Sequence, residues 1–181
     1  MVEYEDDYRI IYLSDDIDSS SIGTAVSHLL KYIAEDDKKD EKKKNYKRKP
    51  VKIYINSFGG GVYDMWALID VIAASKTPIY TYCTGYAMSA GFKIFLAGHK
   101  RFCTKHATFL YHQLSSFIGG KHMDIIEAVE ENERLQTEIE KYVMSRTSIT
   151  KEQIKKVRRN KIDWYIPADE ALKLGIVDEI I

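Results

Sequence analysis

The sequence predicts an α/β fold with a largely parallel inner sheet, and two observations lead to this prediction. Short apolar runs typical of strands alternate with segments that have apolar residues every three or four positions, typical of helices. This alternation continues through residue 111 and then gives way to helices alone. Because parallel strands need a crossover between them, usually a helix, the order favours a parallel sheet covered by helices.

The composition is that of one soluble globular domain, residues 1–181, with 45% hydrophobic and 30% charged residues. Basic and acidic residues number 27 each, so no charge excess points to nucleic acid or a membrane surface. No apolar run reaches the roughly 18 residues of a membrane helix, and no signal peptide is visible. Cys83 and Cys103 are expected as buried free thiols. We expect a cytoplasmic protein.

The first elements follow from apolar patterning. Residues 9–13 (RIIYL) are expected as a strand, and apolar residues between 22 and 33 mark a helix. A strand at 51–56 is broken by glycines and followed by a helix through residue 72. A third strand, 79–84, is expected to end at Gly85, and an apolar helix then runs through residue 96. A strand at 108–111 precedes His112.

The remaining chain is expected to be mainly helical. Residues 124–146 form a helix that is unusually long for a compact domain. Thr150 and Gln153 form a capping box for a shorter helix, and Pro167 and Gly175 suit the first turn and the end of another.

Residues 35–49 (EDDKKDEKKKNYKRK) are almost wholly charged, and we expect a solvated loop because they have nothing to bury. A nucleic-acid patch is disfavoured because acidic residues interrupt it.

Ser89 follows a strand, precedes a helix and has small neighbours, so its hydroxyl could project as a nucleophile. The glycine that usually stands two residues before such a serine is absent, and a structural serine at a tight turn is the alternative. The segment Gly59–Gly61 could present backbone N–H groups to an oxyanion. A plain turn is the alternative there, and a phosphate loop lacks its lysine.

His112 ends a strand and could act as a general base, and Asp163 precedes aromatic residues and could be a partly buried partner for an imidazole. Each residue alone is more typical of an ordinary surface or loop position. No pair of histidines, cysteines or carboxylates has metal-ligand spacing, so neither a metal nor a cofactor is expected.

Four segments together resemble the proteolytic subunit of Clp protease, over about residues 9–181. They are IYINSFGGGVYDMWALIDVI, TYCTGYAMSAGFKIFLAG, KRFCTKHATFLYHQ and DWYIPADEALKLGIVDEII, in the family's order. The resemblance implies a spiral of βαβ units of the Clp protease/crotonase type, with a protruding helix–strand handle at about 113–146. It also implies a catalytic triad of Ser89, His112 and Asp163.

The resemblance further implies a mechanism. His112 takes the proton of Ser89 as it attacks a peptide carbonyl, while Asp163 orients the imidazole. The backbone N–H groups of Gly60 and Ala90 form the oxyanion hole. An extended substrate adds a strand beside Gly59–Gly61.

The implied assembly is a seven-membered ring, or two stacked rings of 14 subunits in all. Hydrolysis itself needs no ATP, and an AAA+ unfoldase would deliver unfolded polypeptides. The chain departs from the family at Phe58, where a proline is usual, and at Lys161 and Ile162, which replace an acidic–basic pair used in ring contacts. Its N-terminal segment before Arg9, which in the family helps to dock the unfoldase, is short.

Two other functions remain open at this point. A crotonase-type acyl-CoA enzyme would use paired oxyanion N–H groups but needs no Ser–His–Asp set. A ring subunit without catalytic activity could act as a scaffold for an active relative.

Overall fold

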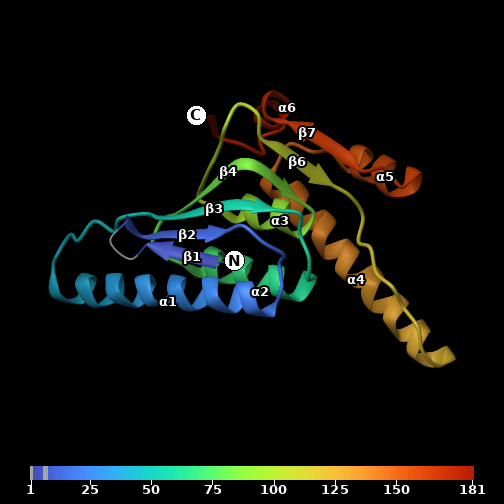
Figure 1. Cartoon of the computed structure of the whole chain (residues 1–181), viewed down its shortest axis with the longest axis horizontal. Helices are drawn as coiled ribbons and strands as arrows, with labels where there is room; N and C mark the ends of the chain where they lie inside the picture. The colour runs from blue at the N-terminus through green and yellow to red at the C-terminus, as the bar shows by residue number, and fades with distance from the viewer. Residues whose placement is uncertain (1, 6–7) are drawn as a thin grey trace.

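The computed structural model describes residues 2–5 and 8–181. Its strands form one sheet, and helices pack against it (Figure 1). The strands are β1 (Val2–Glu5), β2 (Ile10–Leu13), β3 (Val51–Ser57), β4 (Ile79–Met88), β5 (Lys100–Cys103), β6 (Thr108–Tyr111), β7 (Trp164–Pro167) and β8 (Glu179–Ile180). The helices are α1 (Ser19–Lys42), α2 (Val62–Ala74), α3 (Ala90–Ala97), α4 (His122–Arg146), α5 (Lys151–Asn160) and α6 (Ala168–Lys173).

The main path of the sheet is β1-β2-β3-β4-β5-β8, and β2, β3, β4, β5 and β8 pair in parallel. β1 joins antiparallel to β2, and β7 joins antiparallel to β6. The predicted α/β fold with a parallel sheet is confirmed. The sequence reading did not find β1, β5, β7 and β8, which span two to four residues each.

Strand β4 is longer than expected and serves two neighbours. Its first half pairs with β5, and residues 86–88 pair with β6. The prediction that Gly85 ends this strand is wrong. The register of β3 against β4 shifts between Ile55 and Ser57, and this shift lets the pairing of the two strands resume beyond Gly85. Asn56, in that shift, accepts a hydrogen bond from the N–H of Tyr86 through its side chain at 3.0 Å. β4 therefore continues to the residue before Ser89.

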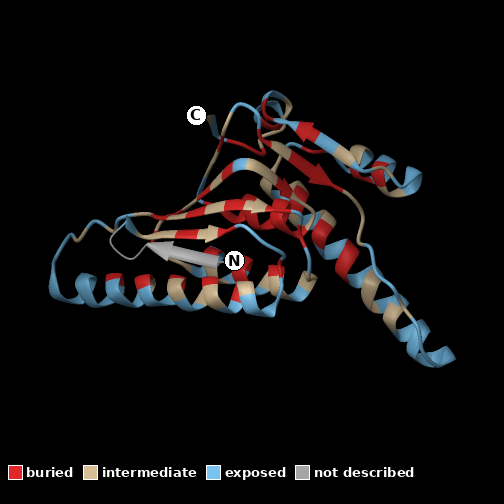
Figure 2. Cartoon of the chain, in the orientation of Figure 1, coloured by how far each residue is buried: buried red, intermediate tan, exposed pale blue. Residues whose placement is uncertain are grey.

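The two faces of the sheet differ. Alternate residues of β2 and β3 are fully buried and point towards the helices α1, α2 and α3, which pack side by side (Figures 1 and 2). The residues between them lie half-buried on the other face. There, aromatic rings of Tyr12, Tyr54, Tyr82 and Phe102 stack across four strands, with successive centroids 5.5, 4.8 and 4.8 Å apart. This alternation is the period of two expected for strands.

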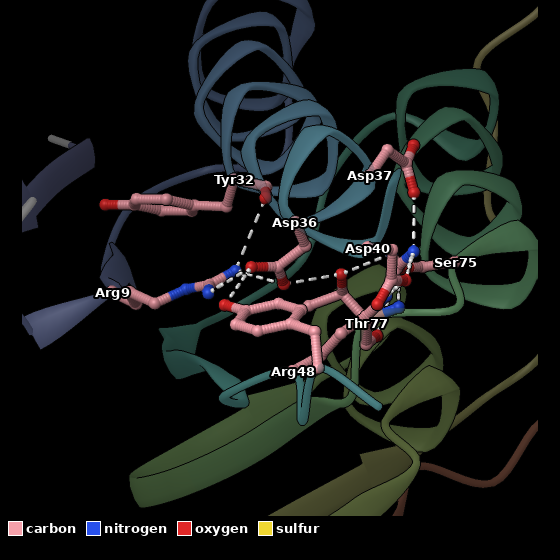
Figure 3. A network of polar contacts seen from close by, with 9 residues as sticks. Arg9, Tyr32, Asp36, Asp37, Asp40, Arg48, Ser75 and Thr77 are labelled. Carbon is pink, nitrogen blue, oxygen red and sulfur yellow. Dashed lines mark hydrogen bonds and ion pairs between the residues drawn. The ribbon is translucent and has the colours of Figure 1, made fainter. Parts of the chain in front are cut away.

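The charged segment is not the solvated loop that we expected, because α1 continues through Lys42. The side chain of Asp36 is fully buried and accepts two hydrogen bonds from Arg9, at 2.8 and 2.9 Å (Figure 3). Thr77 and Tyr46 also donate to this carboxylate, at 2.8 and 3.0 Å. Lysine and glutamate are good helix formers, and the segment does bury one group, an aspartate with four donors.

A second cation holds the outer turns of α1. Arg48, in the chain that returns from the helix to β3, forms ion pairs with Asp37 and Asp40 (Figure 3). It also donates to the hydroxyl of Thr77 at 3.1 Å. The part that remains without helix or strand is therefore residues 43–50.

Helix α4 projects beyond the sheet, and the chain between β6 and α4 runs back along it (Figure 1). Its buried residues all lie in its second half, whereas the first half is mostly exposed (Figure 2). The N–H of Leu114 donates to Gln136 at 2.7 Å, and Asn132 donates to Ser116 at 2.8 Å. Residues 112–121 have no strand assignment, so the expected partner strand of this helix is not formed in the single chain.

Local signals in the C-terminal part were accurate. Thr150 and Gln153 form the predicted capping box of α5, and Pro167 stands at the N-cap position of α6, one residue before the first turn in which we expected it. Gly175 has φ +64° just after α6, a backbone geometry that favours glycine. Cys83 and Cys103 are both buried free thiols, as predicted. Among the described residues, no helix is both long enough and apolar enough to span a lipid bilayer.

Candidate active site

Antiparallel pairing of β6 and β7 places His112 opposite Asp163. In this ladder Tyr111 is the partner of Trp164. His112 follows Tyr111 and Asp163 precedes Trp164, so the same register sets the two residues across from each other at the strand ends. Both line an open pocket of about 580 Å³, which residues 113–116, Leu110, Lys161 and Ile162 complete.

Parallel pairing of β4 and β6 brings Ser89 to the same edge. Met88 is the partner of Leu110, and the N–H of Ser89 donates to the carbonyl of Leu110 at 3.0 Å. Ser89 and His112 therefore each lie one residue beyond the end of a strand, and the two strands are neighbours in the sheet. In parallel sheets such carboxyl ends are where functional side chains converge.

Ser89 has an unusual backbone conformation, with φ +49° and ψ −117°. Non-glycine residues adopt this region rarely, at a cost on the order of 1–3 kcal/mol, and they cluster at active sites. The residue stands between β4 and the first residue of α3, and its side chain makes no capping hydrogen bond to that helix. A sharp strand-to-helix turn, of the kind that can expose a serine hydroxyl, is thus present although the motif lacks the usual preceding glycine.

The glycine segment packs directly against this turn. Gly59 and Gly60 have φ of +113° and +147°. A Cβ on Gly59 would lie 2.7 Å from the Cβ of Ser89 and 2.9 Å from the backbone nitrogen of Ala90. Only a residue without a side chain permits this approach.

The backbone N–H of Gly60 faces away from the neighbouring segment around Ile17. The N–H of Ile17 donates to the carbonyl of Gly59, and the N–H of Gly61 donates to the carbonyl of Ile17. In a parallel bridge of this kind, the N–H of the middle residue, Gly60, points to the opposite side. Ala90 is the first residue of α3, where helical N–H groups have no partner within the helix.

The electrostatics favour a neutral imidazole at His112. Burial, followed by the charge of Lys93, lowers its pKa from the ordinary value, while a backbone hydrogen bond of Gln113 and the charge of Asp163 act in the opposite direction. A neutral imidazole is the form that accepts a proton. Asp163 is more exposed than the partly buried acid that we expected, because it precedes β7 at the open side of the pocket.

No hydrogen bond joins Ser89 to His112, or His112 to Asp163, in the described part of the chain. The strands thus bring the three residues to one edge without hydrogen bonds between them. Catalytic hydrogen bonds are often long in an enzyme without substrate, so this geometry is compatible with a relaxed triad.

Sequence reasoning missed one residue of this region, Lys93 in α3. Its side chain is buried, with 4% of the residue exposed, and its Nζ lies 5.3 Å from the centroid of the Tyr111 ring. The available signal was a single charge inside the apolar run GFKIFLAG. Lysine is almost never buried without a reason, so an isolated lysine in such a helix can be found from sequence.

Comparison with known proteins agrees with this arrangement. The chain is 30% identical over 175 residues to the ATP-dependent Clp protease proteolytic subunit 2 of Synechococcus sp. (strain CC9605), covering 96% of this chain and 83% of that protein. It is 32% identical over 176 residues to the protein of the same name from Frankia casuarinae, covering 96% and 75%. The family description "Clp protease" matches residues 4–181. The chain therefore belongs to the Clp protease family.

Proposed function

We propose that this protein is an active serine peptidase subunit of a compartmental protease, with Ser89 as nucleophile, His112 as general base and Asp163 as the residue that orients the base. The observation that carries the proposal is the strained turn of Ser89 at the same sheet edge as His112 and Asp163. Strain of this kind is retained where it serves a site. Membership of the Clp protease family supports the same chemistry.

The oxyanion would be bound by the N–H groups of Gly60 and Ala90. The close packing of Gly59 against Ser89 and Ala90 keeps these two donors near the serine. The N-terminal end of α3 adds a favourable electrostatic potential for negative charge. Loss of one oxyanion donor typically costs about 3–4 kcal/mol of transition-state stabilisation.

An extended polypeptide is the substrate that this edge would accept. Gly59 packs against Ser89 and Ala90, and residues 113–116 line the pocket that also contains His112. The latter segment has no strand partner in the single chain, so a substrate strand can pair with it. Only an unfolded polypeptide offers such a strand.

The proposed assembly is a ring of seven subunits, alone or as a stacked pair. The first half of α4 supports it, because it leaves Met123, Ile125, Ile126 and Val129 between 37% and 58% exposed. Exposed apolar groups of this kind mark interaction surfaces. We assign residues 113–146 to the handle that joins rings, and we propose an AAA+ unfoldase as the ATP-driven partner.

The competing function is a ring subunit that has lost activity, and the absence of a hydrogen bond between Ser89 and His112 in the described residues is the observation in its favour. Hydrolysis of an unstructured fluorogenic polypeptide by the assembled protein separates the two. We expect turnover that Ser89→Ala lowers by at least about 10⁴-fold, because the attacking oxygen is removed. Ser27→Ala, an exposed serine in α1, is the matched control and should retain wild-type turnover.

A correctly assembled wild-type protein with no turnover above that of Ser89→Ala would favour the scaffold. Turnover that survives in Ser89→Ala would place the nucleophile elsewhere.

A further inference from the structure

Lys93 occupies an environment that is unusual for a lysine. Every residue of α3 is buried, and Lys93 lies in the middle of this helix with 4% of its surface exposed. No ion pair of the described chain includes it. Its Nζ lies 5.3 Å from the centroid of the Tyr111 ring, a cation–π contact. A buried lysine without a carboxylate is costly, so its retention calls for a role.

The fold directs this side chain towards the candidate active site. Lys93 lies one helical turn after Ser89, and its N–H donates to the carbonyl of Ser89 at 3.3 Å. Side chains on a helix tilt towards its N-terminus, which for α3 is the Ser89 end. Tyr111, whose ring Lys93 approaches, is the last residue of β6, directly before His112. The ammonium and the imidazole therefore lie on neighbouring elements, and burial, followed by the charge of Lys93, lowers the pKa of His112.

We propose that Lys93 is a positioning residue that acts through His112: its buried ammonium, held over the Tyr111 ring, disfavours a second positive charge on the imidazole and so keeps the general base neutral. This role rests on the proposed peptidase function, since a neutral base matters only where Ser89 must lose a proton. Lys93 itself touches no reacting atom.

The effect should be confined to the acid side of the pH range. Burial lowers the pKa of Lys93 to about 7. Below that pH the ammonium is charged, which is where His112 would otherwise take up a proton. Above that pH both groups are neutral and the lysine has no electrostatic effect. Removal of Lys93 should therefore raise the pKa of His112 and weaken the base only in mildly acidic solution.

Other polar and charged groups lie near Lys93 and His112, and they must stay unchanged in the test. Asp163 faces His112 from the start of β7 and favours the protonated imidazole. The charges of Glu140 in α4 and Arg158 in α5 act on Tyr111 in opposite directions. Tyr142 of α4 donates to the backbone carbonyl of Lys93 at 3.2 Å. None of these groups replaces the charge that Lys93 supplies.

The test measures His112 without relying on catalysis. In the Ser89→Ala protein, the rate at which diethyl pyrocarbonate modifies His112 is followed by peptide mass spectrometry against pH, since only the neutral imidazole reacts. We expect Lys93→Met to raise the midpoint by about half to one pH unit, equivalent to roughly a 3–10-fold change at fixed pH. Lys93→Gln should do the same if the methionine variant folds poorly, and Lys93→Arg should keep the low midpoint.

A second arm uses the active protein. The rate of fluorophosphonate labelling at Ser89 should fall by about 3–10-fold at pH 6 in Lys93→Met, yet by less than about twofold at pH 8.5. Phe92→Leu, the neighbouring residue of the same buried helix, controls for packing and should lower the rate equally at both pH values, if at all.

An unchanged His112 midpoint in both neutral variants, or an equal shift in Phe92→Leu, overturns the role of Lys93. Absence of labelling in the wild-type protein, together with a midpoint that does shift, would instead reject the proposed peptidase function and leave the electrostatic coupling in place.

Discussion

At the scale of the residue, the conformation of Ser89 is the feature that sequence patterns missed. The motif G-Y-A-M-S-A-G does not contain the glycine usually found two residues before a nucleophilic serine, yet the backbone of Ser89 adopts the positive φ of such a turn. The conformation comes from tertiary contacts: Gly59 packs against its Cβ, and its N–H is bonded to Leu110. No local propensity predicts contacts between residues so distant in sequence.

The strain at Ser89 leads to a stability prediction. Ser89→Gly should be more stable than Ser89→Ala by about 1 kcal/mol, because only glycine adopts this backbone geometry without a steric penalty. The measurement is the difference in urea midpoint between the two variants. In the exposed helical position Ser27 the order should reverse, since glycine costs about 0.5–1 kcal/mol relative to alanine inside a helix. Equal stabilities of the two Ser89 variants would contradict the strained turn.

At the scale of the element, helix α1 shows how one buried ion pair orders a charged segment. Burial by itself raises the pKa of Asp36, but hydrogen bonds from Arg9, Thr77 and Tyr46 outweigh it and leave the pKa below its ordinary value. The carboxylate therefore stays charged at neutral pH and ties the outer half of α1 to the strand edge (Figure 3). This contact links residues that are 27 and 41 positions apart.

Removal of the Asp36 carboxylate should destabilise the protein far more than removal of the neighbouring Asp37 carboxylate. Asp36→Ala should lower the free energy of unfolding by about 3–5 kcal/mol, because it leaves the guanidinium of Arg9 buried without its partner. Asp37→Ala removes a half-exposed partner of Arg48 and should cost less than about 1 kcal/mol. Both are measured by urea denaturation. Similar losses in the two variants would show that the buried contact does not order α1.

The sequence predicted those elements whose signals are local. The capping box of α5, the glycine after α6 and the alternation along β3 all depend on neighbouring residues, and all are confirmed. The short strands β5, β7 and β8 pair with segments far along the chain, so no local pattern marks them. The extension of β4 past Gly85 was missed for the same reason, because the side chain of Asn56 replaces the missing ladder contact.

The candidate site was found by a different kind of signal. Ser89, His112 and Asp163 were each weak candidates alone, and only their joint resemblance to a family selected them. The strand register then places them at one edge, which their positions in sequence could not show. The exposure of Asp163 and the burial of Lys93 depend on packing between elements that are far apart in the sequence.

At the scale of the whole molecule, the single chain lacks two features that the proposed peptidase needs. No hydrogen bond joins Ser89 to His112 among the described residues, and residues 112–121 have no strand partner. The outer half of α4 also leaves apolar side chains uncovered (Figure 2). Contact with a second subunit would cover this helix and order the adjoining segment, which begins at His112. Assembly is therefore expected to be coupled to closure of the proposed triad.

Native mass spectrometry after treatment with a fluorophosphonate tests the enzyme proposal most directly, because it counts subunits and covalent adducts in the same particle. We expect an assembly of seven or fourteen subunits with one adduct on each Ser89, and no adduct in Ser89→Ala. A folded ring that stays unlabelled, or a label that persists in Ser89→Ala, would contradict the assignment of this serine as the nucleophile.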